Sequence, residues 1–201
     1  PLPIQVVFYL QIVWGLVTFI ITIICLQFFL WIAFNSEKLL TGQVVTDALT
    51  GLHNRYYITR QLKEIESTGK MNQYWAALID IDNFKSINYT YGHNYGDYVL
   101  KTLADILRSE CIDMKFCRWG GEEFLIIGKI GDDIMEQQRK LDILRLTVEN
   151  YDFNYKGQHV ELTITIGMTP FGNEGTALDW INLADKKLYL GKQTGKNKVV
   201  L

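Results

Sequence analysis

The chain has 201 residues, a formal net charge of −2 and an isoelectric point near 6.0. This length gives room for one ordinary domain and an appendage. The charge balance excludes the strongly basic field that attracts nucleic acids, so we expect no nucleic-acid partner.

The N-terminal segment lacks charge, because the first charged side chain is that of Glu37. From Ile4 to Phe34 the sequence is apolar apart from scattered Gln and Thr residues. This run exceeds the roughly 20 residues that cross a bilayer core, whereas the apolar region of a signal peptide has only about 7 to 15. A buried core helix is also a poor explanation at this length. We therefore predict a transmembrane helix over residues 1–34, and the start at Pro1 rather than Met leads us to expect a fragment or a processed product.

The rest of the chain alternates between helical and strand patterns. Residues 35–46 are short and amphipathic, which is more typical of a helical connector that transmits motion than of a Gly/Ser linker. Helices are predicted over Tyr56–Glu66, Gly96–Glu110, Asp132–Asn150 and Ala177–Gly191, and strands over Tyr74–Ile81, on either side of Gly120-Gly121, in a hairpin through residues 154–167 and over residues 198–201. Such a mixture predicts an α+β or α/β layered fold, with helices on one or both faces of a sheet.

Two aspartates lie at the end of the first predicted strand. Residues two apart on a strand project to one face, so Asp80 and Asp82 leave the sheet together while Ile81 points the other way. Carboxylates just past an apolar strand lie where an open sheet commonly binds its ligands. Taken alone, however, these two residues would be interpreted as caps of a turn or a helix.

A second carboxylate pair, Glu122 and Glu123, favours a functional site. Adjacent residues on a regular strand face opposite sides, so the two share a site only if the chain turns there, and Gly120-Gly121 predicts a hairpin turn of the two-residue type. A divalent cation with hard oxygen ligands would relieve their repulsion with Asp80. Mg²⁺ held by a few carboxylates and by substrate phosphates is the usual arrangement for phosphoryl and nucleotidyl transfer.

Several ordered motifs carry a resemblance to a known family. They are "DALTGLHNR" (Asp47–Arg55), "DIDNFKSIN" (Asp80–Asn88), "YGHNYGD" (Tyr91–Asp97), "RWGGEEF" (118–124), "TITIG" (163–167) and "ADKKLYLGKQTGKN" (Ala184–Asn197). In this order they resemble the motifs of the GGDEF-domain family, the diguanylate cyclases that condense two GTP into cyclic di-GMP. The resemblance implies a GGDEF catalytic domain over residues 47–201. Its expected fold is α+β, with a central, mostly antiparallel sheet flanked by helices (the palm-like nucleotide cyclase fold) and preceded by the N-terminal transmembrane helix.

The resemblance also implies a metal site and catalytic groups. Asp80, the Ile81 carbonyl and Glu123 would hold the metal ion, Mg²⁺ or Mn²⁺. Glu122 and Glu123 would be the catalytic pair, with Glu122 either at a second metal position or accepting a proton from the attacking 3′-hydroxyl.

Further residues would bind the nucleotide by the same resemblance. Asn88 and Asp97 would bind guanine, and the acceptor role of Asp97 favours GTP over an adenine nucleotide. Lys192 and Lys196 would bind the phosphates as point charges. Without the family pattern we would interpret these residues as turn, cap and solvated surface residues. The phosphates would also be cradled by backbone N–H groups of Asn83, Phe84 and Lys85.

Some positions depart from the family pattern. Tyr89 stands where Asp is frequent, Tyr56 where a second Arg is common, and Lys196 where Arg is frequent. Lysine keeps the charge of arginine but loses its bidentate geometry. The inhibitory R-x-x-D motif of many members is replaced by "CIDM" at residues 111–114, so we predict that this feedback site is absent.

The resemblance implies a membrane-anchored diguanylate cyclase whose two domains face each other as a homodimer, one GTP in each. A GTP-binding regulatory module without turnover is the alternative, and the complete carboxylate set argues against it. A cyclase making 3′,5′-cyclic mononucleotides does not fit the motif order. We expect the inner membrane of the cell as the location, with the catalytic domain in the cytoplasm, because Cys111 and Cys117 lack metal-ligand spacing and a reduced setting is the default for them.

Overall fold

The computed structural model describes residues 3–41, 45–131 and 133–201. The chain divides into two compact units, Pro1–Val44 and Val45–Leu201. The predicted connector over residues 35–46 therefore falls partly in the first helix, while residues 42–44 lie outside the described residues. Asp132, the predicted start of a helix, also lies outside them.

The first unit contains the single helix α1 (Ile4–Thr41). Its part Ile4–Ala33 has a mean hydropathy of 2.5 and is long and apolar enough to cross a membrane, by length and composition. Two polar side chains within it are satisfied locally, because the hydroxyls of Thr18 and Thr22 donate to carbonyls three and four residues back. A largely apolar helix whose threonine hydroxyls bond to its own backbone suits a bilayer.

The second unit is built on a central sheet. Its strands are β1 (His53–Asn54), β2 (Tyr74–Ile81), β3 (Lys115–Arg118), β4 (Glu123–Lys129), β7 (Ile164–Pro170) and β8 (Val199–Val200), in the spatial order β1-β3-β4-β2-β7-β8. The pairs β2–β4, β2–β7 and β3–β4 are antiparallel, and the edge pairs β1–β3 and β7–β8 are parallel. The predicted α+β fold with a mostly antiparallel central sheet is thus confirmed.

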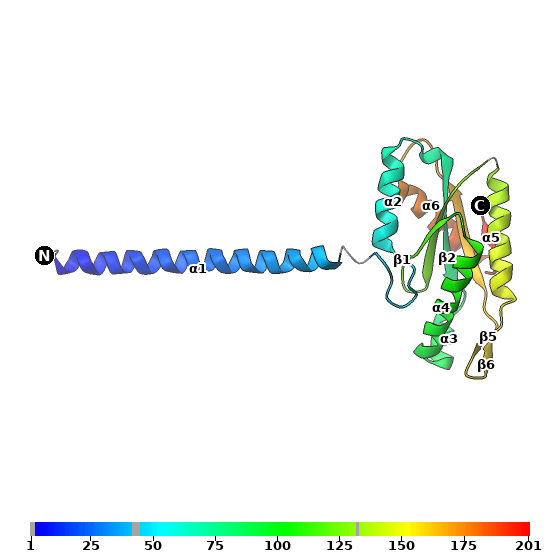
Figure 1. Ribbon diagram of the computed structural model, residues 1–201, viewed down its shortest axis with the longest axis horizontal. Helices are drawn as coiled ribbons and strands as arrows, with labels where there is room; N and C mark the ends of the chain where they lie inside the picture. The colour runs from blue at the N-terminus through cyan, green and yellow to red at the C-terminus, as the bar shows by residue number, and fades with distance from the viewer. Residues whose placement is uncertain (1–2, 42–44, 132) are drawn as a thin grey trace. The chain divides into compact units, whose positions relative to one another are not determined.

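Helices cover both faces of this sheet (Figure 1). One face packs against α2 (Arg55–Ser67) and α6 (Ala177–Gln193), and the other against α3 (Phe84–Tyr91), α4 (His93–Glu110) and α5 (Ile134–Glu149). A short 3-10 helix, η1 (Met71–Gln73), precedes β2. Because side chains alternate along a strand, β2 sends Ala76 and Leu78 to the α2/α6 core and Trp75, Ala77 and Ile79 to the other core.

Local sequence signals explain where several helices begin. Asn54 and Asp133 accept backbone N–H groups at the starts of α2 and α5, and Thr176 and Asp179 form a capping box at the start of α6. Such caps satisfy N–H groups that have no partner inside the helix. The approach of α6 to the sheet depends on Gly167, where a Cβ would lie 2.2 Å from the carbonyl oxygen of Ala184.

The structure corrects three predicted elements. Helix α3 was not predicted, because its residues were expected to form a loop. Helix α4 begins at His93 rather than at Gly96, and Gly92, at φ +85°, separates the two helices. The predicted hairpin through residues 154–167 is also wrong in extent. Lys156 and Gly157, both at positive φ, form a tight turn between β5 (Phe153–Tyr155) and β6 (Gln158–Val160), which make a separate two-stranded sheet. The following segment, β7, pairs with β2 in the central sheet instead.

Candidate active site

Two carboxylates face each other across the central strands. Alternate residues of a strand share a face, so Asp80 lies on the same face of β2 as Ala76 and Leu78. Helices α2 and α6 cover this face. Its partner in the β2–β4 register is Glu123, and like charges directly opposite each other repel. The pKa of Glu123 is accordingly raised, first by burial and then by the charge of Asp80. Burial also raises the pKa of Asp80, with a smaller contribution from the charge of Asp82.

Glu122 adds another negative charge from the loop between β3 and β4. Its side chain is half-buried, and its pKa is raised by burial and then by the charges of Asp80 and Glu123. The hairpin therefore brings both predicted catalytic glutamates close to Asp80. Carboxylates held together against their repulsion are typical of sites that receive a cation.

The turn of this hairpin differs from the prediction. Neither Gly120 nor Gly121 has the positive φ that a two-residue I′ or II′ turn requires. Instead the N–H groups of Trp119 and Gly120 both donate to the Glu123 carbonyl, at 2.8 and 3.2 Å, which closes a wider loop. The φ angle of Gly120 does not require glycine, but a Cβ there would lie 2.8 Å from Oε2 of Glu123, so a larger residue would shift that carboxylate.

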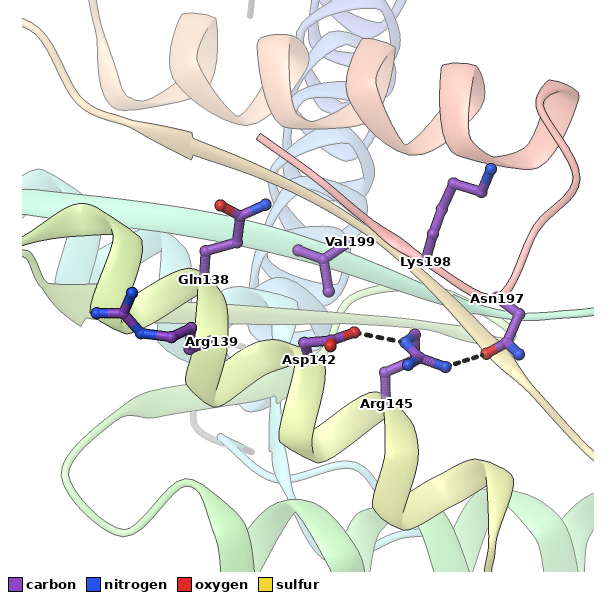
Figure 2. A pocket seen from close by; sticks show the side chains of 7 residues that line it. All are labelled: Gln138, Arg139, Asp142, Arg145, Asn197, Lys198 and Val199. Carbon is purple, nitrogen blue, oxygen red and sulfur yellow. Dashed lines mark hydrogen bonds and ion pairs between the residues drawn. The ribbon is translucent and has the colours of Figure 1, made fainter.

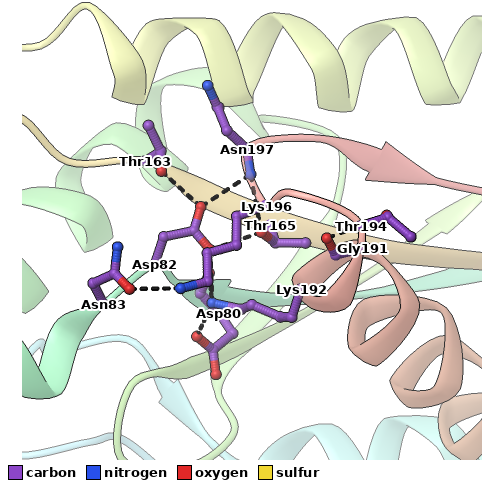
Figure 3. Close-up of polar contacts among 10 residues, drawn as sticks. All are labelled: Asp80, Asp82, Asn83, Thr163, Thr165, Gly191, Lys192, Thr194, Lys196 and Asn197. Atoms are coloured by element: carbon purple, nitrogen blue, oxygen red, sulfur yellow. Dashed lines mark hydrogen bonds and ion pairs between the residues drawn. The ribbon is translucent and has the colours of Figure 1, made fainter.

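Lys192, on the last turn of α6, joins Asp80 of β2 to Asp82, which follows that strand (Figure 3). Its Nζ lies 2.5 Å from Oδ1 of Asp80, 3.3 Å from the Asp80 carbonyl oxygen and 2.8 Å from Oδ1 of Asp82. Among the residues that the structure describes, no three His, Cys, Asp or Glu side chains are grouped closely enough to hold a metal ion. The ammonium group of Lys192 is hydrogen-bonded to Asp80 and balances its charge, and the charge of Lys196 adds a smaller contribution.

Asp82 is the most enclosed of the carboxylates, with a side chain only 1% exposed. Besides Lys192, it accepts hydrogen bonds from the hydroxyls of Thr163 and Thr165, both at 2.7 Å, and from the N–H of Asn197 at 3.1 Å. Burial alone would raise the pKa of Asp82, but the hydrogen bonds from Lys192, Thr163 and Thr165 outweigh burial and lower it. Asp82 is therefore an ionised structural acceptor with four hydrogen-bond donors, whereas the side chain of Asp80 accepts, among the described residues, from Lys192 alone.

The second predicted phosphate-binding lysine lies beside the start of α3. Lys196 Nζ donates to Oδ1 of Asn83 at 2.6 Å, so that side chain caps no N–H group of α3. Both residues have left-handed backbones, with φ 60° at Lys196 and 58° at Asn83. The structure thus brings Lys196 to the loop whose N–H groups, at Asn83, Phe84 and Lys85, were predicted to cradle phosphates.

The residues predicted to bind guanine lie on neighbouring helices. Asn88 is on α3 and Asp97 on α4, and the two helices pack together. Gly96, next to Asp97, makes this possible, because a Cβ there would lie 2.0 Å from Oδ1 of Asn88. Asp97 and Lys85 are exposed, whereas Phe84 is a core residue. Asn88 and Asp97 thus lie on one pair of packed helices. Among the described residues, no hydrogen bond or ion pair links either of them to Asp80.

Comparison with known proteins decides the family. The family described as "Diguanylate cyclase, GGDEF domain" matches residues 44–198. This chain belongs to the GGDEF-domain family. In the GGDEF domain the quoted motifs lie in or beside β1, β2, α3, α4, the β3–β4 hairpin, β7 and α6.

Named relatives and solved structures agree with this assignment. The chain is 38% identical over 162 residues to diguanylate cyclase DgcZ of Escherichia coli, covering 80% of this chain and 54% of that protein. It is 39% identical over 163 residues to the response regulator PleD of Caulobacter vibrioides, covering 78% of this chain and 36% of that protein. The solved GGDEF domain of DgcB from Caulobacter crescentus, in complex with c-di-GMP, matches with a TM-score of 0.74 and 26% identity, over 79% of this chain and 95% of that one. The chain thus spans only about half, or less, of these two curated relatives.

The structure adds a contact around the hairpin that the sequence did not indicate. Arg118 donates to the Gly121 carbonyl through Nη2 at 2.6 Å and to both carboxylate oxygens of Asp47 through Nη1 at 3.2 Å. Asp47 in turn accepts from the N–H and hydroxyl of Thr50. Both Asp47 and Arg118 lie in quoted motifs, but their separation of 71 residues hides the pairing from the sequence.

Thr163, Thr165 and Asn197 were also missed as parts of the site. Thr163 and Thr165 belong to the "TITIG" motif, and Asn197 is the last residue of "ADKKLYLGKQTGKN", but only the fold brings them to Asp82. Their membership of these motifs is the sequence signal that could have found them.

Proposed function

We propose that this protein is a membrane-anchored diguanylate cyclase that condenses two GTP molecules into cyclic di-GMP. The proposal rests on one observation above all. In a GGDEF domain, Asp80 and Glu123 are paired across two strands at the place where Lys192 and Lys196 converge. The names of DgcZ, a diguanylate cyclase, and of the DgcB domain solved with c-di-GMP support the same activity.

The donor set suits a hard divalent cation. Cyclases of this family generally need one, and we propose that Asp80, the Ile81 carbonyl and Glu123 hold Mg²⁺ or Mn²⁺ here. All three offer oxygen ligands, which these ions prefer, and the raised pKa of Glu123 beside Asp80 reflects a repulsion that a cation relieves. A bound ion would neutralise developing charge on the triphosphate. Because Lys192 now balances Asp80, cation binding implies that this lysine moves toward the phosphates.

Substrate binding follows from the surrounding groups. We propose that Lys192 and Lys196 bind the phosphates together with the N–H groups of Asn83, Phe84 and Lys85. We assign guanine recognition to Asn88 and to Asp97, whose carboxylate accepts hydrogen bonds but donates none. A carboxylate that only accepts selects a base that presents hydrogen-bond donors on the edge facing it, as guanine does.

The proposed reaction joins two nucleotides held by two domains. The 3′-oxygen of each GTP forms a bond to the α-phosphorus of the other, the α–β phosphoanhydride bond breaks, and pyrophosphate leaves, giving one cyclic di-GMP and two pyrophosphates. Glu122 accepts the hydroxyl proton, and its raised pKa favours that role over the role of a spectator carboxylate. Most of the rate enhancement then comes from positioning and electrostatics.

We further propose the arrangement of the chain in the cell. Residues 1–34 would anchor the protein in the inner membrane, and residues 35–46 would be a helical connector between this anchor and the catalytic domain. Residues 47–201 would act in the cytoplasm as a homodimer. The apolar run Ile4–Ala33 supports the anchor. The buried thiols of Cys111 and Cys117, whose pKa burial raises to about 12, are inert and compatible with a reducing compartment.

One experiment tests the function. The full chain, reconstituted in detergent micelles, is incubated with GTP and Mg²⁺ or Mn²⁺, and the products are identified by chromatography and mass spectrometry. Cyclic di-GMP with two equivalents of pyrophosphate is the expected result. A 3′,5′-cyclic mononucleotide would contradict the proposal, and bound but unconverted GTP would indicate a regulatory module.

A further inference from the structure

Asn197 connects the candidate active site to the outer helix α5. Its N–H donates to Oδ2 of Asp82 and to the hydroxyl of Thr165, both at 3.1 Å (Figure 3). Its side chain points to the opposite side, where Oδ1 accepts from Nη1 of Arg145 at 2.8 Å and Nδ2 donates to Oε1 of Glu149 at 2.7 Å. Both the backbone and the side chain of this single residue are thus fully engaged.

The contact on α5 is itself well ordered. The side chain of Arg145 is only 12% exposed and donates to Asp142 at 2.7 Å as well as to Asn197 (Figure 2). It also donates to Glu149 at 2.8 Å. A pocket beside it is lined in part by Arg139 and Lys198. Its cations are already paired, because Lys198 donates to the Thr194 carbonyl and Arg139 lies 3.5 Å from a carboxylate oxygen of Asp133. The geometry therefore favours a role in holding the loop over a role in binding an anion from solution.

The loop between α6 and β8 needs such support. Lys196 and Asn197 have φ values of 60° and 47°, and left-handed backbone at residues other than glycine persists only where surrounding contacts enforce it. Lys192 precedes the loop on the last turn of α6, and Lys196 lies within it. The direction of both ammonium groups therefore depends on how the loop is fixed.

We propose that Asn197 is a positioning residue for the two phosphate-binding lysines and that Arg145, on α5, holds it in place. Asp82 and Thr165 hold its backbone from the sheet, and Arg145 and Glu149 hold its side chain from α5. Of the residues in this network, only the lysines contact the substrate; Asn197 and Arg145 act through them. This inference rests on the proposed function, because it assumes that these lysines bind a triphosphate.

The test compares two ligands in the full chain in detergent micelles with Mg²⁺. The first is GTP with an α,β-methylene bridge, which cannot react, and the second is GMP, which lacks most of the phosphate charge. Asn197→Ala should lower the affinity for the triphosphate about tenfold, the scale of one lost hydrogen bond to a charged group, and leave the GMP affinity within about twofold. Arg145→Gln should act in the same direction. The matched control is Arg139→Gln, on the same helix and the same pocket but with a side chain 69% exposed, and it should change neither affinity.

A double variant separates positioning from general stability. If Arg145 acts through Asn197, the double variant should bind the triphosphate no more weakly than Asn197→Ala alone, because coupled residues are not additive. The inference would be overturned if the double variant lost triphosphate affinity by the product of the two single losses. It would also be overturned if the affinities for GMP and for the triphosphate fell equally. Wild-type protein that binds the triphosphate selectively but makes no cyclic di-GMP would refute the proposed function and leave the inference standing. Wild-type protein that prefers neither ligand would refute both.

Discussion

At the scale of single residues, two aspartates on one strand end have opposite roles. Asp80 and Asp82 both contact Lys192. Asp82 is surrounded by further donors that lower its pKa, whereas the pKa of Asp80 is raised by burial, with only Lys192 hydrogen-bonded to it. A carboxylate with one exchangeable partner can take a cation in its place. A carboxylate with four donors instead holds the surrounding strands and loop together. Of the two aspartates, Asp80 is therefore the one that we propose as a metal ligand.

Glu123→Gln tests the assigned metal ligand. The variant keeps the shape of the side chain but removes its charge, so turnover of GTP should fall by at least about a hundredfold, as for loss of a group that stabilises the transition state electrostatically. Asp185→Asn is the control, because it removes a charge that also raises the pKa of Glu123 without removing a ligand. Steady-state rates at saturating Mg²⁺ provide the measurement, and undiminished turnover in Glu123→Gln would refute the assignment.

The same variant has a predicted effect on stability without metal. The pKa of Glu123 is raised above its ordinary value of 4.5 in the fold, so the folded state binds a proton more tightly than the unfolded state. The stability that this group contributes is therefore fully present below about pH 4.5, and it is lost as the pH rises through the raised pKa. Glu123→Gln should abolish that loss, and its melting temperature should be equal to or above that of the wild type at pH 7. A lower melting temperature at pH 7 would show that the carboxylate is stabilised in the metal-free fold.

Asp47→Asn tests the contact between the first motif and the hairpin. The pKa of Asp47 is lowered: burial opposes this, but hydrogen bonds from Thr50 and Arg118 outweigh it. The ionised form therefore adds stability above the ordinary pKa of 3.8, and this is lost as the pH falls through the lower folded value. The variant should unfold about 1 kcal/mol more easily at pH 7, and the difference should shrink toward pH 3. Asp113→Asn, at an exposed position, is the control for denaturant titrations; equal effects of both variants would contradict the prediction.

At the scale of elements, the segment between α4 and β3 is the one where the sequence predicts that a feedback site is absent. Cys111 closes α4 and is only 2% exposed, while Ile112 is 82% exposed. A buried thiol and an exposed apolar side chain offer no cation to a phosphate. These two positions are therefore consistent with the prediction that the segment does not bind the product.

The absent motif leads to a kinetic prediction. Cyclic di-GMP should inhibit weakly, and only by competing with GTP at the active site, so it should raise KM and leave kcat unchanged. Initial rates over a matrix of GTP and cyclic di-GMP concentrations give the answer. Potent inhibition that high GTP does not reverse would reveal a second binding site on this domain.

Elements differed in how well the sequence predicted them, for identifiable reasons. Strand β2 has the predicted bounds, Tyr74–Ile81, because an unbroken apolar run buried on both faces has a strong pattern. Helix α3 was missed because it is only eight residues long and follows Asn83, whose left-handed backbone cannot be recognised from the residue type. Gly120-Gly121 suggested the wrong turn, since the sequence does not distinguish a glycine chosen for positive φ from one chosen for space. The Asp82–Asn197 contact joins residues 115 apart and follows only from the strand order.

At the scale of the whole molecule, the chain divides into a unit with the long apolar helix and a unit with the GGDEF domain. The unit Val45–Leu201 has its own cores on both faces of its sheet. Its first residues belong to it, because the Val45 carbonyl accepts from the N–H of Asn54 at 2.9 Å. Residues 45–201 are therefore expected to fold without α1, and the proposed reaction needs two such units.

Activity should therefore depend on bringing two domains together. One domain holds one nucleotide, so the reaction is second order in domains unless a tether joins them, and a short tether raises the effective concentration to about millimolar. The membrane span and connector would be such a tether. Detached residues 45–201 should bind GTP, and their specific activity should rise with protein concentration. Replacing the span with a parallel coiled coil should restore activity at low concentration, whereas an equally long monomeric helix, as control, should not. Specific activity that is independent of concentration, in a detached domain that sediments as a monomer, would mean that one domain completes the reaction and that the span serves only to anchor it.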